Sequence, residues 1–191
     1  MASTRSATSV RATCALLLAL LLGLPGALPA GAAPSSESVA GVRTANPTIL
    51  GTLRIPRFGP DYAEQIGEGI GESEVLNQMI GHFPETADAG APGNFALAGH
   101  RVTYGKPFNL IHTLVLGDEI YVDTPAGTYL YRFRSSEYVD PSAIRVTYPV
   151  PHQNVASSPD SILTFVACSP MGSTAERIIA YGVLESFTPA G

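Results

Sequence analysis

The chain has 191 residues, of which 45% are hydrophobic and 14% charged, with two cysteines and no tryptophan. Arg5 and Arg11 are the only basic residues before Ala33, so the remainder carries nine basic and all sixteen acidic residues. This acidic balance argues against binding to nucleic acid and against electrostatic docking on anionic lipid. The length beyond Ala33 suits a single domain with a full core.

The first 32 residues have the pattern of an export signal. Arg5 and Arg11 precede a short apolar run, "CALLLALLLGL", and residues 30–32 fit an A-x-A cleavage site. Without cleavage, residues 12–28 are just long enough for a membrane span with its basic end inside. We therefore predict a signal peptide or an N-terminal membrane anchor at 1–32. Both alternatives place the rest of the chain outside the cytoplasm, either secreted or anchored at the cell surface.

The polar, small residues 33–47 predict a linker, and residues 48–191 then form one folded domain. The domain begins with "TILGTLRIPRFG", which predicts a strand that ends at Pro56 and Gly59. The next segment, "GESEVLNQMIGHFP", has apolar residues at helical spacing, and Ser73 could cap its N-terminus. It is therefore the best helix candidate in the chain, and His82 would lie at its end.

The remaining segments predict strands and tight turns. "GNFALAGHR" is a short apolar strand, and "GKPFNLIHTL" could hold one helical turn. "DEIYVDTPAGTYLYRFRSSEYVDP" alternates apolar and polar residues on both sides of the turn "TPAG". "SILTFVAC" and "ERIIAYGVLESF" are β-rich runs joined by the loop "SPMGSTA". The pattern indicates a mostly-β barrel or sandwich.

Cys168 is the only cysteine beyond the first fourteen residues. An odd cysteine in an exported domain suggests an intermolecular disulfide or a reactive thiol. The alternative is a buried cysteine that packs as a small apolar side chain. Cys168 ends its predicted strand where the chain turns into a loop, so its sulfur could be presented at a barrel rim.

Two other residues lie at predicted strand ends. His100 ends "NFALAGH", and the glycine before it lets the backbone come close to a neighbouring group. Arg177 opens the last strand and would lie beside Cys168 if the two strands pair. The alternatives without a catalytic role are that His100 is a structural histidine and that Arg177 is a solvated charge at the strand edge. We interpret the other histidines as structural, and no pair has metal-ligand spacing, which argues against a zinc site. These histidines are His82, His112 and His152.

Cysteine, histidine and arginine together suit nucleophilic attack on an amide. The attacking species is the thiolate, and an ordinary thiol with a pKa of about 8.5 supplies little of it at neutral pH. The reaction also needs a proton donor for the leaving amine and a hydrogen-bond donor for the developing oxyanion. His100 could supply the proton, and Arg177 the hydrogen bond.

"NFALAGHRVTYGKPF" followed by "ILTFVACSPMGSTAERIIAYG" closely resembles the sortases, the cysteine transpeptidases of Gram-positive cell surfaces. The resemblance covers residues 48–187 and includes "LRIPRFG" and the order His, Cys, Arg, with eight residues between the last two. It implies a closed β-barrel of about eight strands with one or two short helices. The segment "HRVTYG" is most similar to class E sortases.

The resemblance also implies residue roles and partners. Cys168 would be the nucleophile, His100 the general acid and then base, and Arg177 the clamp for the oxyanion and substrate. The substrates would be surface proteins with sorting signals such as LPXTG, cleaved between Thr and Gly. The acyl group would pass to an amine of a peptidoglycan precursor or a pilin, with no cofactor. In class E, a tyrosine at the Tyr104 position accompanies a preference for LAXTG, which makes Tyr104 a substrate-contacting candidate.

One position departs from the family pattern T-L-x-T-C, because Ala167 replaces the threonine before the cysteine. This change is the one feature that favours a sortase-like protein that binds sorting signals without turnover. A second alternative is an enzyme of the L,D-transpeptidase type, in which His152 would serve Cys168. That family expects S-x-G-C, and Ala167 stands where its glycine would be.

Overall fold

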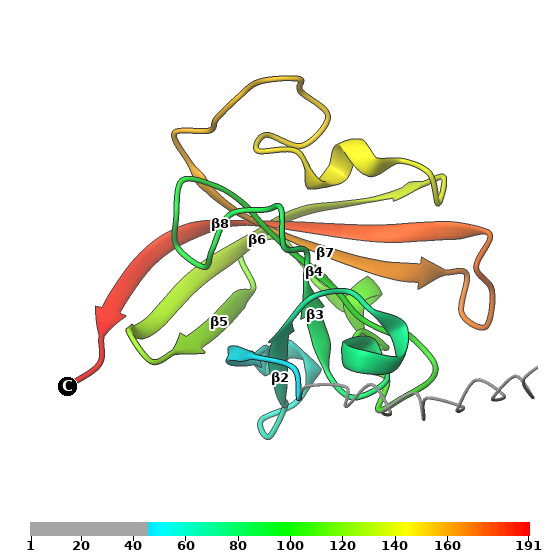
Figure 1. Ribbon diagram of the computed structural model, residues 1–191, viewed down its shortest axis with the longest axis horizontal. Coiled ribbons are helices and arrows are strands. Elements are labelled where there is room, and N and C mark those ends of the chain that lie inside the picture. Colours follow the sequence, from blue (N-terminus) through cyan, green and yellow to red (C-terminus); the bar gives the residue numbers. More distant parts are fainter. Residues whose placement is uncertain (1–45) are drawn as a thin grey trace, which may run out of the picture. The chain divides into compact units, whose positions relative to one another are not determined.

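The computed structural model describes residues 46–191, in which eight strands close into a barrel (Figure 1). This confirms the mostly-β prediction and selects the barrel over the sandwich. Four short helical turns accompany the strands in this range, where one or two short helices were expected. The strands are β1 (Ile49–Arg54), β2 (Ala63–Glu68), β3 (Ile80–His82), β4 (Gly93–Ala98), β5 (Glu119–Thr124), β6 (Gly127–Val139), β7 (Ser161–Ser169) and β8 (Glu176–Pro189). The helical turns are η1 (Pro56–Phe58), η2 (Glu72–Leu76), η3 (Ile111–Thr113) and η4 (Ile144–Thr147).

The predicted signal peptide or anchor, and nearly all of the predicted linker, concern residues 1–45, which lie outside the described range. Within residues 46–191, no helix has the length and apolar character needed to cross a membrane.

The barrel runs β1-β2-β3-β4-β7-β8-β6-β5 and closes between β5 and β1. Most neighbours are antiparallel, but β2–β3 and β4–β7 are parallel. Parallel neighbours finish at the same edge of a sheet. The topology therefore brings together the end of β4, which His100 follows, and the end of β7, which contains Cys168.

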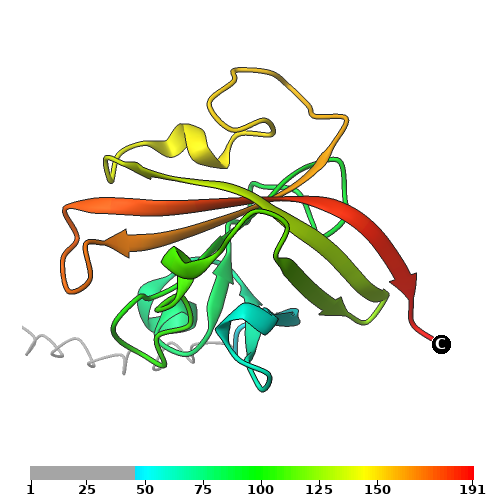
Figure 2. The ribbon, with the colours of Figure 1, turned by 180° about the vertical axis from the view of Figure 1, so that it is seen from behind.

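Strand β4 is buried on both faces, which explains its continuous apolar sequence. Phe95 and Leu97 belong to the barrel core. The opposite face holds Asn94, whose Nδ2 donates to the carbonyl oxygens of Val146 and Tyr148, at 3.0 Å each. The segment between β6 and β7 is thereby fixed across this part of the barrel, and Figures 1 and 2 show it along one side of β6, β7 and β8.

The helix expected in residues 71–84 is wrong for most of its length. One turn, η2, forms after Gly71 without a side-chain cap from Ser73, and the chain then enters β3. β3 pairs with both β2 and β4, so tertiary hydrogen bonds override the helical periodicity. A Cβ at Gly81 would overlap the carbonyl oxygen of Gly69, which shows how closely the backbones pack there.

His82 was expected to end that helix, but it lies in β3 with only 2% of its surface exposed. Its Nδ1 is 2.8 Å from Glu68 Oε2, and its Nε2 is 3.0 Å from Thr86 Oγ1. Replacing it with alanine should leave a cavity and an unpartnered carboxylate. We expect His82→Ala to lower the free energy of unfolding by about 2–4 kcal/mol.

Thermal unfolding checks this prediction, with a drop in Tm of roughly 5–15 °C for a domain of this size. His112→Ala is the matched control, because His112 is exposed in η3 and its replacement should leave Tm unchanged. Equal unfolding temperatures for the two variants would contradict a structural role for His82.

Candidate active site

Cys168 and Arg177 lie directly opposite each other on the antiparallel strands β7 and β8. Directly opposed residues of an antiparallel pair project from the same face of the sheet. The expectation that Arg177 lies beside the sulfur if the strands pair is therefore confirmed at the level of strand register. The Arg177 Nη1 donates to the carbonyl oxygens of Thr174 and Glu176, at 3.0 Å each. Its guanidinium forms no ion pair with a carboxylate of the described residues.

A groove of about 360 Å³ lies on this same face of β7 and β8 and is named here the β6–β7 groove. Its floor contains Val166, which shares a face with Cys168 because side chains alternate along a strand, together with Arg177 and Ile179. Its wall comes from the segment that follows β6, including η4. The lining residues are Phe83, Val139, Asp140, Pro141, Ser142, Ala143, Ile144, Val146, Thr147, Val166, Arg177 and Ile179.

The groove is mainly apolar, with opposite charges at one end. Ser142 donates to Asp140 from both its hydroxyl and its backbone N–H. These hydrogen bonds hold the pKa of the Asp140 carboxyl below its ordinary value, and the positive charge of Arg177 adds a smaller effect in the same direction. The groove therefore offers an apolar surface that ends near a carboxylate and a guanidinium.

His100 stands two residues beyond the end of β4, next to the end of β7. Ala98 pairs with Val166, and the Gly99 N–H donates to the carbonyl oxygen of Val166 at 3.2 Å. His100 and Cys168 each lie two residues beyond the paired residues Ala98 and Val166. Because the two strands are parallel, His100 and Cys168 lie at the same height along them. No hydrogen bond joins the imidazole to the thiol within the described residues.

Asn77, which was not anticipated from the sequence, contacts the imidazole of His100. Its Oδ1 lies 3.2 Å from His100 Nε2, so this ring nitrogen carries a hydrogen if it bonds the amide oxygen. Asn77 follows η2 in the segment predicted as a helix, and no local pattern of residues indicates that this segment turns toward the end of β4. The pair favours one orientation of the imidazole ring.

Tyr104 packs against His100, with ring centroids 5.0 Å apart, and is 54% exposed. Tyr104, Gly105 and Lys106 all have positive φ angles, of 47°, 78° and 59°. A left-handed conformation is strained for residues other than glycine, and such strain is found at ligand sites more often than elsewhere. Tyr104 therefore lies where a bound substrate could meet both it and His100.

The remaining candidates are placed elsewhere. His152 Nε2 is 2.5 Å from Glu137 Oε1, and Tyr181 donates to the same oxygen, so this histidine is held at the sheet surface by β6 and β8. His152 does not bond to Cys168, which removes support from the L,D-transpeptidase alternative. Among residues 46–191, no group of three or more histidine, cysteine or acidic side chains could hold a metal ion.

Ala167 is 2% exposed and belongs to the barrel core. Its side chain faces inward, while that of Cys168 faces outward, because neighbours on a strand alternate. The missing threonine hydroxyl would therefore project from the opposite face of β7 to the thiol. This placement weakens the one argument from sequence for a protein without turnover.

The sortase domain family matches residues 53–185 of this chain. Among curated relatives, Sortase SrtE1 of Streptomyces coelicolor is 37% identical over 145 residues, which are 72% of this chain and 40% of that protein. Sortase SrtE2 of the same organism is 25% identical over 147 residues, which are 71% of this chain and 55% of that protein. The chain thus spans less than two thirds of the length of either relative.

Solved structures agree with this comparison. Sortase E1 from Streptomyces coelicolor, determined with a tripeptide in the active site, has a TM-score of 0.68 at 34% identity and covers 76% of this chain and 94% of its own. Sortase E from Streptomyces avermitilis has a TM-score of 0.68 at 30% identity, and the match covers 76% of this chain and 93% of that chain. SrtA sortase from Actinomyces oris has a TM-score of 0.70 at 34% identity, and the match covers 76% of this chain and 84% of that chain. The chain therefore belongs to the sortase family, and its relatives are consistent with class E.

Proposed function

We propose that this sortase cleaves the Thr–Gly bond of LAXTG- or LPXTG-type sorting signals and transfers the protein to an amine. The observation that carries the proposal is the register of the sheet. It sets Cys168 opposite Arg177 on β8 and brings the end of β4, with His100, to the other side of β7. Three groups suited to acyl transfer thus surround one strand end, beside a groove that could hold an extended peptide.

In the proposed first step, Cys168 acts as the thiolate and His100 carries a second proton. The sulfur attacks the threonine carbonyl carbon, and the carbonyl oxygen gains negative charge. Arg177 is placed to stabilise that oxyanion, because its guanidinium is permanently charged and forms no ion pair within residues 46–191. The C–N bond then breaks, and His100 gives a proton to the departing glycine amine. The product is a thioester between Cys168 and the threonine.

In the second step, an amine attacks the thioester carbonyl. His100, now neutral, takes a proton from the attacking amine, and the C–S bond breaks to release the Cys168 thiolate. The new amide joins the sorted protein to the acceptor, which we propose is the amine of a peptidoglycan precursor or a pilin. The sequence of bond changes needs no cofactor.

The partners and location follow from the same proposal. The substrates are surface proteins that carry the sorting signal, and the reaction takes place outside the cytoplasm. Residues 1–32 would serve there as a signal peptide or as the membrane anchor. The apolar β6–β7 groove suits the first residues of the sorting signal, because Leu and Ala or Pro are apolar.

Intact mass spectrometry tests the proposal on the full chain in detergent. The protein is incubated with LAXTG and LPXTG peptides and with no amine acceptor. We expect a mass gain equal to the peptide truncated after threonine less one water, and its loss when an amine such as triglycine is added. A correctly folded protein that gains no mass with either peptide would contradict the proposal.

Tyr104 is proposed to set the choice between the two peptides. Removing a contact with one side chain changes discrimination by about tenfold. We therefore expect Tyr104→Ala to reduce the LAXTG preference, measured as the ratio of kcat/KM for the two peptides, by about that factor. Tyr138→Ala is the matched control, since Tyr138 is an equally exposed tyrosine on β6 (57%). An unchanged ratio in Tyr104→Ala would exclude this role.

A further inference from the structure

Arg101, the residue after His100, is buried at the end of β7, with 6% of its surface exposed. Its Nη1 is 3.2 Å from Ser169 Oγ and 3.4 Å from the carbonyl oxygen of Cys168. Its Nε is buried and has no hydrogen-bond partner among residues 46–191. The side chain thus reaches from the chain segment of His100 to the backbone of Cys168.

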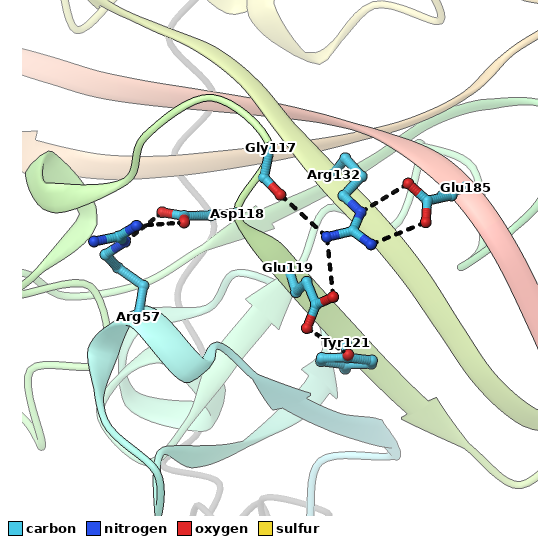
Figure 3. Close-up of polar contacts among 7 residues, drawn as sticks. All are labelled: Arg57, Gly117, Asp118, Glu119, Tyr121, Arg132 and Glu185. Atoms are coloured by element: carbon cyan, nitrogen blue, oxygen red, sulfur yellow. Dashed lines mark hydrogen bonds and ion pairs between the residues drawn. The ribbon is translucent and has the colours of Figure 1, made fainter.

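Other arginines of the domain are satisfied differently, as Figure 3 shows. Arg57 holds both carboxylate oxygens of Asp118 at 2.6 Å, and Arg132 makes the same paired contact with Glu185 at 2.7 and 3.0 Å. These guanidinium groups lie at the surface. Arg101 is buried and forms no ion pair with a carboxylate of the described residues. Burying an unpaired charge lowers stability, so the contribution of Arg101 to folding does not explain its presence.

The regular ladder between β4 and β7 stops just before this point. Its last backbone hydrogen bond joins the Gly99 N–H to Val166, and the chain after His100 leaves the sheet. The following loop includes three consecutive residues with positive φ angles, 104–106. After Gly99, the two hydrogen bonds of Arg101 join the His100 segment directly to the end of β7.

We propose that Arg101 is a positioning residue, which fixes the separation between His100 and Cys168 by tying their two chain segments together. This inference rests on the proposed acyl transfer, in which His100 exchanges a proton with the amine next to the thioester of Cys168. In the proposed mechanism, Arg101 touches neither the substrate nor the reacting atoms. Arg101 binds the carbonyl oxygen of Cys168 and the hydroxyl of Ser169. Because Arg101 directly follows His100, these two hydrogen bonds hold the backbone of Cys168 at a set distance from His100.

Arg101→Met tests the inference in the full chain, because methionine keeps an apolar stem and removes all the donors. A displacement of about 1 Å between reacting groups can cost about 100-fold in rate. We expect kcat for peptide cleavage to fall by about that factor, while KM stays within about threefold, since the groove is untouched. Arg101→Lys, which keeps charge and donors, should recover part of kcat. Arg134→Met, at an exposed arginine of β6, is the matched control and should match the parent.

A double-mutant cycle separates positioning from a general structural effect. If Arg101 acts through His100, then Arg101→Met should reduce kcat little further in a His100→Ala background. An undiminished 100-fold loss in that background, or a kcat within about threefold of the parent in Arg101→Met alone, would overturn the inference. Should Arg101→Met not fold, Ser169→Ala replaces it, with an expected loss in kcat of about fivefold for one hydrogen bond. A parental kcat in that folded Ser169→Ala variant would overturn the inference.

A crystal structure of Arg101→Met decides the inference even if the parent proves unable to transfer an acyl group. The His100 segment should then lie displaced from the end of β7 relative to the parent crystal structure. Unchanged positions of His100 and Cys168 would overturn the inference. Failure of the parent with both peptides would instead count against the proposed function.

Discussion

Replacing Cys168 by alanine should abolish both the peptide adduct and turnover. The proposed reaction has no other nucleophile, and loss of a covalent nucleophile typically costs on the order of 10⁶-fold in kcat. The residue is also half-buried in a strand, so removing one sulfur should leave the barrel folded. Intact mass spectrometry with the LAXTG peptide measures the adduct directly.

The control for this prediction is Cys14→Ala, which removes the other cysteine of the chain. This variant should form the adduct as fully as the parent. An adduct of the same mass on Cys168→Ala would show that another residue attacks the peptide, and the assignment of Cys168 would then be wrong.

Replacing His100 by alanine should give the second largest loss. A general acid or base contributes about 10²–10⁴-fold, and in the proposed mechanism His100 acts in both steps. We therefore expect kcat to fall by about 10³-fold or more, measured by release of the glycine-containing fragment. Asn77 and Tyr104 would lose their contact with the ring, but neither is part of the barrel core.

His112→Ala is the matched control, because His112 is exposed and lies in η3, outside the groove lining. It should retain the activity of the parent. A His100→Ala variant with parental activity, together with an inactive and folded His152→Ala, would move the proton-transfer role to the histidine held by Glu137.

Hydrophobic patterning in the sequence was informative where a segment carries its own signal. The alternation on both sides of "TPAG" correctly predicts the β5–β6 hairpin, and the apolar runs before Cys168 and after Arg177 correctly predict β7 and β8. Such patterns are local, because a strand with one buried face alternates with period two. The resemblance to the sortases, which the family match confirms, rested in part on the segments that form β7 and β8.

The sequence misled where partners distant in the chain decide the structure. β2 was not predicted, and β3 was mistaken for part of a helix, because the three residues of β3 are too few to show a period. Their strand conformation comes from pairing with each other and with neighbouring strands. His82 was accordingly placed at a helix end, when it is a buried side chain bonded to Glu68.

The sequence by itself thus determined the order His100, Cys168, Arg177 and the strands that end at them, since residue type and period are local properties. Only the tertiary structure decided that Arg177 lies opposite Cys168 and that Asn77 and Arg101 contact these segments. The physical reason is that register and side-chain contacts depend on strand pairing between residues as far as 71 positions apart, as Thr52 and Asp123 are. No period in the sequence records such a pairing, because it is selected by the packing of the whole barrel.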